Sequence, residues 1–267
     1  MTSQDILVSI VIPTYNSAKY INESIDSVLS QTISNWEIRI VDDCSTDDTY
    51  QILLPYLNKY SNIHYYRLEE NSGAHVARSV AIKQSVGKYI AFLDSDDLWL
   101  PNKLETQIGF MEENDIDFSC TAYRQNNEIN PSKVYAIYPP KRTDYKKMLR
   151  LSCPIGNSTV IYNQENLGKF TVPNIRKRND FALWLKILKN TDYCYGLQNE
   201  LTIYRIREDS ISNNKLGLIK YHWELYFRIE KLGLFKSVWY TLCWAWVKGI
   251  GIGLKKQKSI DLNNDCY

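Results

Sequence analysis

Cysteine and histidine are too scattered in this sequence to support the sites that they usually build. The six cysteines are irregularly spaced and form no C-x-x-C pair, so a disulfide framework is not indicated. The three histidines, His64, His75 and His222, lie far apart along the chain, which argues against a zinc site. The first five residues are polar and too short to form a signal peptide. We therefore expect a reduced, cytosolic compartment.

The sequence also lacks a strong net charge and a run of apolar residues long enough to cross a membrane. Its 32 Lys and Arg residues nearly balance 30 Asp and Glu residues, for a net charge of +2, so no general attraction to nucleic acid is expected. The tryptophan-rich segment Ser237–Val247 is uncharged for only 11 residues, whereas a membrane-spanning helix needs about 20. Binding to anions or to a membrane surface must therefore depend on local clusters.

The chain does have an ordinary globular composition and an alternating pattern of strands and helices. With 267 residues, 44% of them hydrophobic, it can bury a substantial core. Apolar residues at helical spacing follow short β-branched runs, and Asn16 or Ser17 is the expected cap of the first helix. The predicted strands are Val8–Ile12, Ile38–Val41, Ile63–Leu68 and Tyr89–Leu93.

This alternation predicts an α/β fold with a doubly wound, mostly parallel sheet. We expect one catalytic domain over residues 1–215, in which the less regular part after about residue 118 completes the sheet and forms the acceptor side. An aromatic-rich helical tail is expected over residues 216–267. Ligands of such sheets bind beyond the carboxyl ends of the strands. Those ends are Pro13–Asn16, Asp42-Asp43 and Asp94–Asp97, and two of the three are acidic.

The acidic segment Asp94-Ser95-Asp96-Asp97 is the strongest chemical signal in the sequence. Three carboxylates within four residues repel one another, and a bound cation relieves that repulsion. Hard oxygen ligands without His or Cys favour Mg²⁺ or Mn²⁺, which typically take one or two carboxylates and leave positions for phosphates. We expect Asp94 and Asp96 to hold the metal. A solvated turn that caps the next helix is the alternative.

The other two strand ends suggest contacts with a nucleoside. One carboxylate of Asp42-Asp43 can accept a hydrogen bond from uracil while its neighbour orients the loop, or the pair can simply favour the start of the next helix. Tyr15, in Pro13–Asn16, offers an aromatic face on which a base can stack. A plain turn between strand and helix is the alternative for that segment.

Arg78 and Asp180 are the remaining candidates for chemistry. Arg78 follows the flexible turn Asn71-Ser72-Gly73 and can pair with a phosphate or with the aspartates, or it can be an ordinary surface arginine. Asp180 follows the basic run Arg176-Lys177-Arg178. It can act as a general base that the nearby cations keep ionised, or it can be a carboxylate that stabilises a helix N-terminus.

Taken together, these motifs resemble those of inverting family 2 glycosyltransferases with a GT-A fold, which build bacterial surface polysaccharides. The later blocks look most like the teichuronic-acid and O-antigen transferases of this family. The dense part of the resemblance covers about the first 110 residues, with a weaker part at Arg178–Trp184 and Tyr204-Arg205. The dense motifs are Val8–Asn16, Ser27–Thr32, Val41–Asp47, Asn71–Ala74 with Ala77-Arg78, and Gly87–Asp97.

The resemblance implies a role for each candidate residue. Pro13, Tyr15 and Asp43 match positions that hold the nucleoside, with Asp43 on uracil, and Arg78 matches an arginine near the nucleotide. Asp94 and Asp96 correspond to the D-x-D motif, in which Asp96 contacts the metal directly. Asp180 falls at the place of the catalytic base, although the family often has Glu-Asp where this chain has Asn179-Asp180.

The implied reaction is a single displacement with inversion. It transfers one sugar from a UDP-sugar, with UDP-Glc or UDP-Gal favoured, to a polyprenyl-diphosphate-linked saccharide, and it needs Mn²⁺ or Mg²⁺. The Q-x-x-R-W motif of processive synthases is absent, which favours a single addition. A metal-dependent sugar nucleotidyltransferase is one alternative, but the first strand lacks the glycine-rich loop with a lysine that such enzymes show. A non-catalytic nucleotide-sugar-binding module is the other.

The tail segment Phe235–Leu254 combines three tryptophans with several nearby lysines. Trp239, Trp244 and Trp246 are suited to a membrane interface, and Lys248, Lys255, Lys256 and Lys258 to anionic headgroups. We expect peripheral attachment to the cytoplasmic face of the bacterial plasma membrane. A helix docked on the protein's own core, or a dimer contact, is the alternative.

Overall fold

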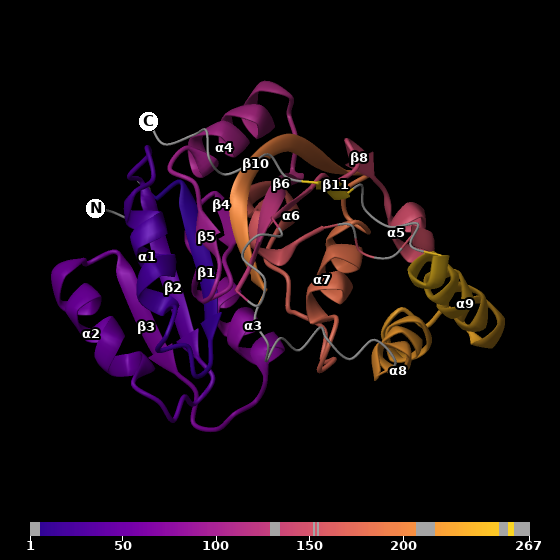
Figure 1. Ribbon diagram of the computed structural model, residues 1–267, viewed down its shortest axis with the longest axis horizontal. Helices are drawn as coiled ribbons and strands as arrows, with labels where there is room; N and C mark the ends of the chain where they lie inside the picture. Colours follow the sequence, from indigo (N-terminus) through magenta and orange to yellow (C-terminus); the bar gives the residue numbers. More distant parts are fainter. Residues whose placement is uncertain are drawn as a thin grey trace.

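Four parallel strands form the half of the sheet built by the first hundred residues (Figure 1). The computed structural model describes residues 6–128, 134–151, 153, 155–206, 217–250 and 256–258. Strand β1 (Val8–Thr14) pairs with β2 (Trp36–Asp42) and β4 (Tyr89–Phe92), and β3 (Ile63–Arg67) extends the sheet beyond β2. All of β1 is buried, as expected of a central strand covered on both faces. The four strands predicted from the sequence are confirmed.

Helices cover both faces of this sheet, which confirms the doubly wound class. On one face, α1 (Ile21–Leu29), α2 (Thr49–Lys59) and α4 (Lys103–Glu113) share an apolar cluster with β1 and β2. On the other face, α3 (Ala74–Gln84) and α7 (Asn179–Ile187) form a second cluster around β4. The two clusters are separated by the sheet, so the sheet forms the middle of three layers.

The second half of the sheet is mixed rather than parallel. Strand β9 (Ile161–Asn163) runs antiparallel between β4 and β6 (Phe118–Asn127). The long strand β10 (Cys194–Ile206) pairs in parallel with β6 and antiparallel with two short strands, β5 (Leu98–Trp99) and β8 (Arg142–Thr143). Strands β7 (Tyr135–Ile137) and β11 (Lys256–Lys258) extend the edge beyond β6. The middle of the chain therefore completes the sheet, as predicted.

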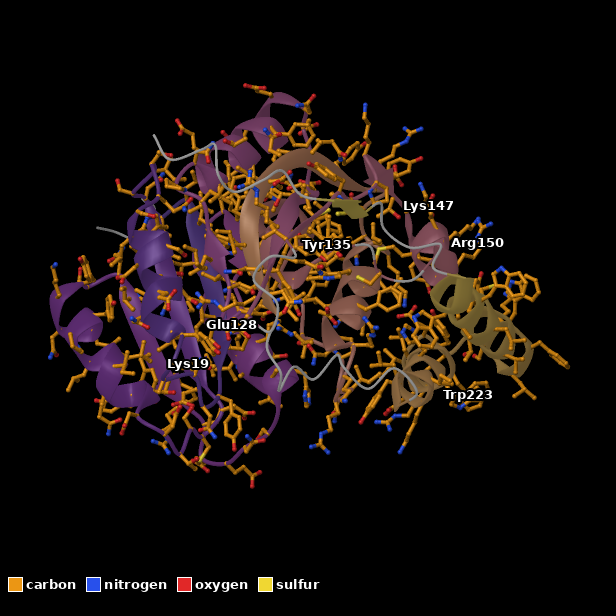
Figure 2. The ribbon with its side chains drawn as sticks, in the orientation of Figure 1. Lys19, Glu128, Tyr135, Lys147, Arg150 and Trp223 are labelled. Carbon is orange, nitrogen blue, oxygen red and sulfur yellow. The ribbon has the colours of Figure 1, made fainter. Side chains whose placement is uncertain are left out.

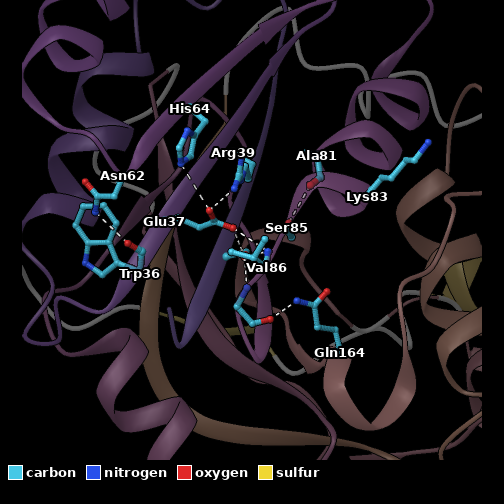
Figure 3. A network of polar contacts seen from close by, with 12 residues as sticks. Trp36, Glu37, Arg39, Asn62, His64, Ala81, Lys83, Ser85, Val86 and Gln164 are labelled. Atoms are coloured by element: carbon cyan, nitrogen blue, oxygen red, sulfur yellow. Dashed lines mark hydrogen bonds and ion pairs between the residues drawn. The ribbon is translucent and has the colours of Figure 1, made fainter. Parts of the chain in front are cut away.

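A buried carboxylate fastens the amino-terminal edge of the parallel strands (Figure 3). Glu37 is 2% exposed, and its carboxylate accepts hydrogen bonds from Ser9 Oγ at 2.6 Å and from the Val86 backbone N–H at 2.9 Å. The same carboxylate pairs with Arg39 and lies 3.7 Å from His64 Nε2. A Cβ atom at Gly87 would lie 2.7 Å from the Ser9 nitrogen, so only glycine fits beside this bond network.

The first helix begins later than its predicted cap. Helix α1 starts at Ile21 after Tyr20, and no side chain caps it. The Ser17 carbonyl accepts hydrogen bonds from the Tyr20 and Ile21 nitrogens, while the Asn16 side chain accepts one from the Thr46 nitrogen at 2.8 Å. The predicted cap at Asn16 or Ser17 is therefore wrong, because both residues hold the strand-end loops together instead.

The tail forms a helical extension that packs against the body. Helix α8 (Gly217–Glu224), a π-helical turn (Leu225–Ile229) and α9 (Leu234–Ile250) follow β10, and α9 lies beside α5 (Tyr145–Leu151) (Figure 1). Tyr226 Oη donates a hydrogen bond to the Leu149 carbonyl oxygen at 3.2 Å. The expected boundary at residues 215 and 216 lies outside the described residues. In the described part of the chain, no helix is both long and apolar enough to cross a membrane.

Candidate active site

The acidic turn after β4 is held by side chains and backbone from distant parts of the chain. Asp97 is fully buried, and it accepts hydrogen bonds from Ser158 Oγ and from the Arg205 backbone N–H. Burial raises the pKa of Asp97 well above its ordinary value, and the neighbouring Asp96 and Asp94 raise it further. Asp97 therefore anchors the turn, whereas Asp94 and Asp96 line an adjacent cavity of about 330 Å³.

Asp94 has an amide, a guanidinium group and two other carboxylates as neighbours. Its Oδ1 accepts hydrogen bonds from Asn157 Nδ2 at 2.7 Å and from Arg78 Nη2 at 3.3 Å. Burial raises the pKa of Asp94 to about 6, an effect that Arg78 opposes and that Asp96 and Asp180 reinforce. The structure thus brings Asp94, Asp96 and Asp180 within electrostatic reach of one another, although Asp180 is distant in the sequence.

Arg78 connects the acidic turn to the start of α7. The residue is 4% exposed, so the alternative of an ordinary surface arginine is wrong. Its Nη1 donates a hydrogen bond to Asn179 Oδ1, and its Nη2 donates to Asp94. One guanidinium group therefore fixes the first aspartate of the turn relative to the residue before Asp180. Where the resembling family often has Glu, Asn179 supplies a neutral acceptor for this bond.

Asp180 lies in the first turn of α7 and lines the same cavity. The residue before the helix, Arg178, has a left-handed backbone with φ 66°. Arg176, Lys177 and Arg178 all line the cavity. The complete lining consists of Pro13, Ala74, Arg78, Asp94, Ser95, Asp96, Asn157, Arg176, Lys177, Arg178, Asn179, Asp180, Tyr204 and Leu218.

The two aspartates after β2 have different surroundings. Asp43 is 4% exposed and accepts hydrogen bonds from the backbone nitrogens of Ser72 and Gly73 at 2.7 and 2.8 Å. Asp42 is fully buried and accepts hydrogen bonds from Ser45 and from Tyr65 Oη. Both carboxylates fasten the loops at the carboxyl edge, and each retains free lone pairs. A nucleotide contact by either residue stays a prediction.

The two other predicted nucleoside residues are close to this edge. Pro13 lines the cavity of Asp94 and Asp180, and the Tyr15 side chain is 48% exposed. An exposed aromatic ring two positions after a residue that lines the cavity is available for stacking with a base. Base stacking on Tyr15 stays a prediction.

The residues at the acidic turn fit a hard divalent cation. Asp94 and Asp96 present oxygen ligands, and a cation would offset both the burial of the Asp94 carboxylate, which is the main cause of its raised pKa, and its repulsion by Asp96. Among the described residues, no three His, Cys, Asp or Glu side chains form a complete metal site. A cation held by two aspartates therefore depends on further oxygens, which is typical of Mg²⁺ and Mn²⁺ bound with substrate phosphates.

Asn157 was not predicted as a site residue, although it lies inside the cavity. It belongs to a short 3₁₀ turn, Asn157–Thr159, and is 8% exposed. Its Nδ2 donates to Asp94, while its buried Oδ1 has no hydrogen-bond partner among the described residues. A buried amide oxygen without a hydrogen-bond donor destabilises the fold. Asn157 Oδ1 is therefore suited to accept a hydrogen bond from a hydroxyl group of a ligand or from a water molecule. The three-residue turn has no periodic pattern that could have revealed it.

Tyr204 reaches the cavity from β10. Burial raises the pKa of its phenol, with further contributions from Asp97, Asp94 and Asp96. Tyr204 belongs to the weaker part of the family resemblance, which implies no function for it. The structure places its ring beside Tyr123, with 5.8 Å between ring centroids.

Comparison with known proteins places this site in a family. The profile of Glycosyl transferase family 2 matches residues 9–170. The chain is 42% identical over 239 residues to TuaG of Bacillus subtilis, whose name assigns it to teichuronic acid biosynthesis, covering 90% of this chain and 94% of TuaG. It is 40% identical to the Escherichia coli UDP-Glc:α-D-GlcNAc-diphosphoundecaprenol β-1,3-glucosyltransferase WfgD, covering 83% of this chain and 85% of WfgD.

Solved structures agree on the fold. TarS 1–349 of S. aureus, in complex with UDP-GlcNAc, superposes with a TM-score of 0.67 at 26% identity, covering 82% of this chain and 65% of that one. This chain thus spans a little under two thirds of the TarS fragment. A mannosyltransferase of Pyrobaculum calidifontis, in complex with GDP-Man and Mn²⁺, has a TM-score of 0.61 at 15% identity, which shows the fold alone. The chain belongs to glycosyltransferase family 2, has a GT-A fold, and is related to transferases of bacterial polysaccharide synthesis.

Proposed function

We propose that this enzyme transfers one hexose, with inversion, from a UDP-sugar to a saccharide linked to a polyprenyl diphosphate. The observation that carries the proposal is that Asp94, Asp96 and Asp180 line the same cavity and that Asp96 and Asp180 act electrostatically on Asp94. Complexes of TarS with UDP and UDP-GlcNAc support a UDP-sugar donor. The name of WfgD supports UDP-Glc and a lipid diphosphate acceptor. UDP-Glc and UDP-Gal are the favoured donors.

In the proposed mechanism, Asp180 removes the proton of the acceptor hydroxyl as that oxygen attacks the anomeric carbon. The attack on the face opposite the departing UDP converts an α-linked donor into a β-linked product. Arg78 donates hydrogen bonds to both Asp94 and Asn179. These bonds fix the distance between the acidic turn and Asp180, the residue that follows Asn179. A divalent cation bound by Asp94 and Asp96 supplies positive charge that stabilises the departing diphosphate.

The same proposal includes attachment to the cytoplasmic surface of the membrane, where a polyprenyl acceptor resides. One face of α9 exposes four large apolar side chains at helical spacing, between 60 and 89% exposed: Phe235, Trp239, Leu242 and Trp246. Lys231 and Lys236 are exposed nearby. In Figure 2, Lys147 and Arg150 of α5 and Trp223 of α8 lie at the same end of the molecule. Apolar and cationic side chains together suit an anionic membrane surface. Lys248, Lys255, Lys256 and Lys258 have no described side chains.

A donor and acceptor screen tests the function. The purified enzyme receives UDP-Glc, UDP-Gal, UDP-GlcNAc or UDP-GalNAc with Mn²⁺ and a short-chain prenyl diphosphate linked to GlcNAc. We expect UDP release with UDP-Glc or UDP-Gal and a β anomeric coupling in the NMR spectrum of the product. An α product would contradict the inversion. Formation of a nucleotide-sugar from a sugar phosphate and UTP would instead support the nucleotidyltransferase alternative, which membership of family 2 disfavours.

A further inference from the structure

The cavity has a second charged end that the acidic turn does not use. Arg176, Lys177 and Arg178 form its wall on the side of α8. Among the described residues, no ion pair joins Arg176 or Arg178 to a carboxylate. The Arg178 Nε–H is buried and has no hydrogen-bond acceptor in the described part of the chain. Buried donors of this kind are usually paired, so this end of the cavity is suited to an anion.

The donor diphosphate does not account for these cations. Asp94 and Asp96, where a cation would bind the donor phosphates, belong to the turn after β4, whereas the three basic residues precede α7. Both terminal nitrogens of Arg78 are already bonded to protein oxygens. The basic end is therefore a separate concentration of positive charge, and the N-terminus of the nine-residue helix α7 adds to it. The buried, unpartnered Asn157 Oδ1 independently indicates that the cavity receives a polar ligand.

We propose that Arg176 and Arg178 bind the diphosphate of the lipid-linked acceptor, an inference that rests on the proposed function. Arg178 and Asp180 are two positions apart in the sequence, so their Cα atoms are at most about 7 Å apart. A single sugar between the diphosphate and the reacting hydroxyl suits this spacing. The acceptor class is therefore a polyprenyl diphosphate that carries one sugar, and the enzyme adds the second.

The surroundings of the basic end give the acceptor a direction. Leu218 of α8 lines the cavity, and the Lys177 ammonium lies 5.7 Å from the centre of the Tyr221 ring. Ile219 of α8 and Phe227 of the π-helical turn that follows it are exposed apolar side chains. A molecule bound with its sugar at Asp180 and its diphosphate at Arg178 thus directs its lipid toward α8 and α9.

The first experiment measures binding without turnover, so that it does not depend on the transfer reaction. Farnesyl diphosphate is titrated into the enzyme saturated with UDP and Mn²⁺, with farnesol as the neutral control. We expect farnesyl diphosphate to bind wild type at least tenfold more tightly than it binds Arg176→Gln/Arg178→Gln, the range for lost charge-assisted hydrogen bonds. The control Lys186→Gln, at the other end of α7, should match wild type. Equal binding of farnesol, or equal binding by the double variant, overturns the inference.

The second experiment separates this inference from the proposed function. With prenyl-diphosphate GlcNAc as acceptor, the double variant should show at least a tenfold higher acceptor KM and an unchanged donor KM. With a neutral alkyl glycoside of GlcNAc, which has no diphosphate, the acceptor KM of the double variant should equal that of wild type. A loss of UDP affinity would assign the two arginines to the donor and overturn the inference. If no donor supports transfer while farnesyl diphosphate still binds through the arginines, the proposed function fails and the anion site stands.

Discussion

At the scale of single residues, Asp180 is the group whose replacement most directly tests the chemistry. Asp180→Asn keeps the shape of the side chain but removes its capacity to accept a proton. We expect turnover to fall by about 10²–10⁴-fold, while calorimetry shows nearly unchanged affinity for UDP-sugar and Mn²⁺. Asp117→Asn, on an exposed carboxylate that accepts a bond from Asn166, is the matched control. Loss of donor affinity together with turnover would indicate a structural or metal-binding role.

The bond between Arg78 and Asn179 predicts a stability effect at the same site. Asn179→Ala removes the acceptor of Arg78 Nη1 and leaves a buried cationic donor unpaired. We expect the free energy of unfolding to fall by about 1.5–3 kcal/mol, measured by urea denaturation. Asn190→Ala, in the exposed turn that follows the same helix, removes only a side-chain bond to the Lys186 carbonyl and serves as control. Equal losses in both variants would show that Arg78 finds another acceptor.

His64 reports on the network around Glu37. Burial lowers the pKa of His64 below 6.5, Arg39 lowers it further, and Glu37 opposes the shift. Arg39→Gln should therefore raise the pKa of His64 in an NMR titration, whereas His75, which responds to Asp43 and Arg78, should not change. Because the folded protein binds this proton at lower pH than the unfolded chain, stability decreases as the pH falls from 6.5 toward the folded pKa. A wild-type His64 that titrates at or above 6.5 would contradict the prediction.

At the scale of elements, α9 presents tryptophans in two opposite environments. Trp239 and Trp246 are 62 and 68% exposed, whereas Trp244 is 4% exposed and stacks on the His222 ring at 4.1 Å between centroids. Trp239→Gln/Trp246→Gln should lose co-sedimentation with anionic liposomes at low salt and keep the melting temperature of wild type. Trp244→Ala should lower the melting temperature and leave liposome binding intact. A wild-type protein that never binds liposomes would refute membrane attachment.

The elements also show where sequence reasoning works. Strands β1 to β4 and the acidic ends of β2 and β4 were predictable, because buried parallel strands appear as short β-branched runs. Asn16 and Ser17, by contrast, were the expected caps of α1, but the Asn16 side chain accepts a hydrogen bond from the Thr46 nitrogen and α1 begins at Ile21. The mixed pairing of β10 and the contact of Asn157 with Asp94 join segments far apart in sequence. No local pattern encodes such contacts.

At the scale of the whole molecule, the metal and the donor should stabilise the fold through the acidic turn. A ligand that binds only the folded state at 100 times its Kd adds about 2.7 kcal/mol to the free energy of unfolding. We expect Mn²⁺ with UDP to raise the melting temperature of wild type but not of Asp96→Ala, which should also lose transfer activity. EDTA should abolish transfer, and Mn²⁺ or Mg²⁺ should restore it. Full activity after exhaustive metal removal would refute the metal requirement.

The hydrogen bonds that anchor Asp97 determine how much of the chain must be synthesised before the active site can form. Ser158 and Arg205, which donate these bonds, follow Asp97 by 61 and 108 residues. At synthesis rates of about 5–20 residues per second, Arg205 is added about 5–20 s after Asp97. During that interval a nascent chain has its parallel strands but lacks the groups that fix the acidic turn. The nascent enzyme is therefore unable to consume nucleotide-sugar until nearly all of its catalytic domain has been translated.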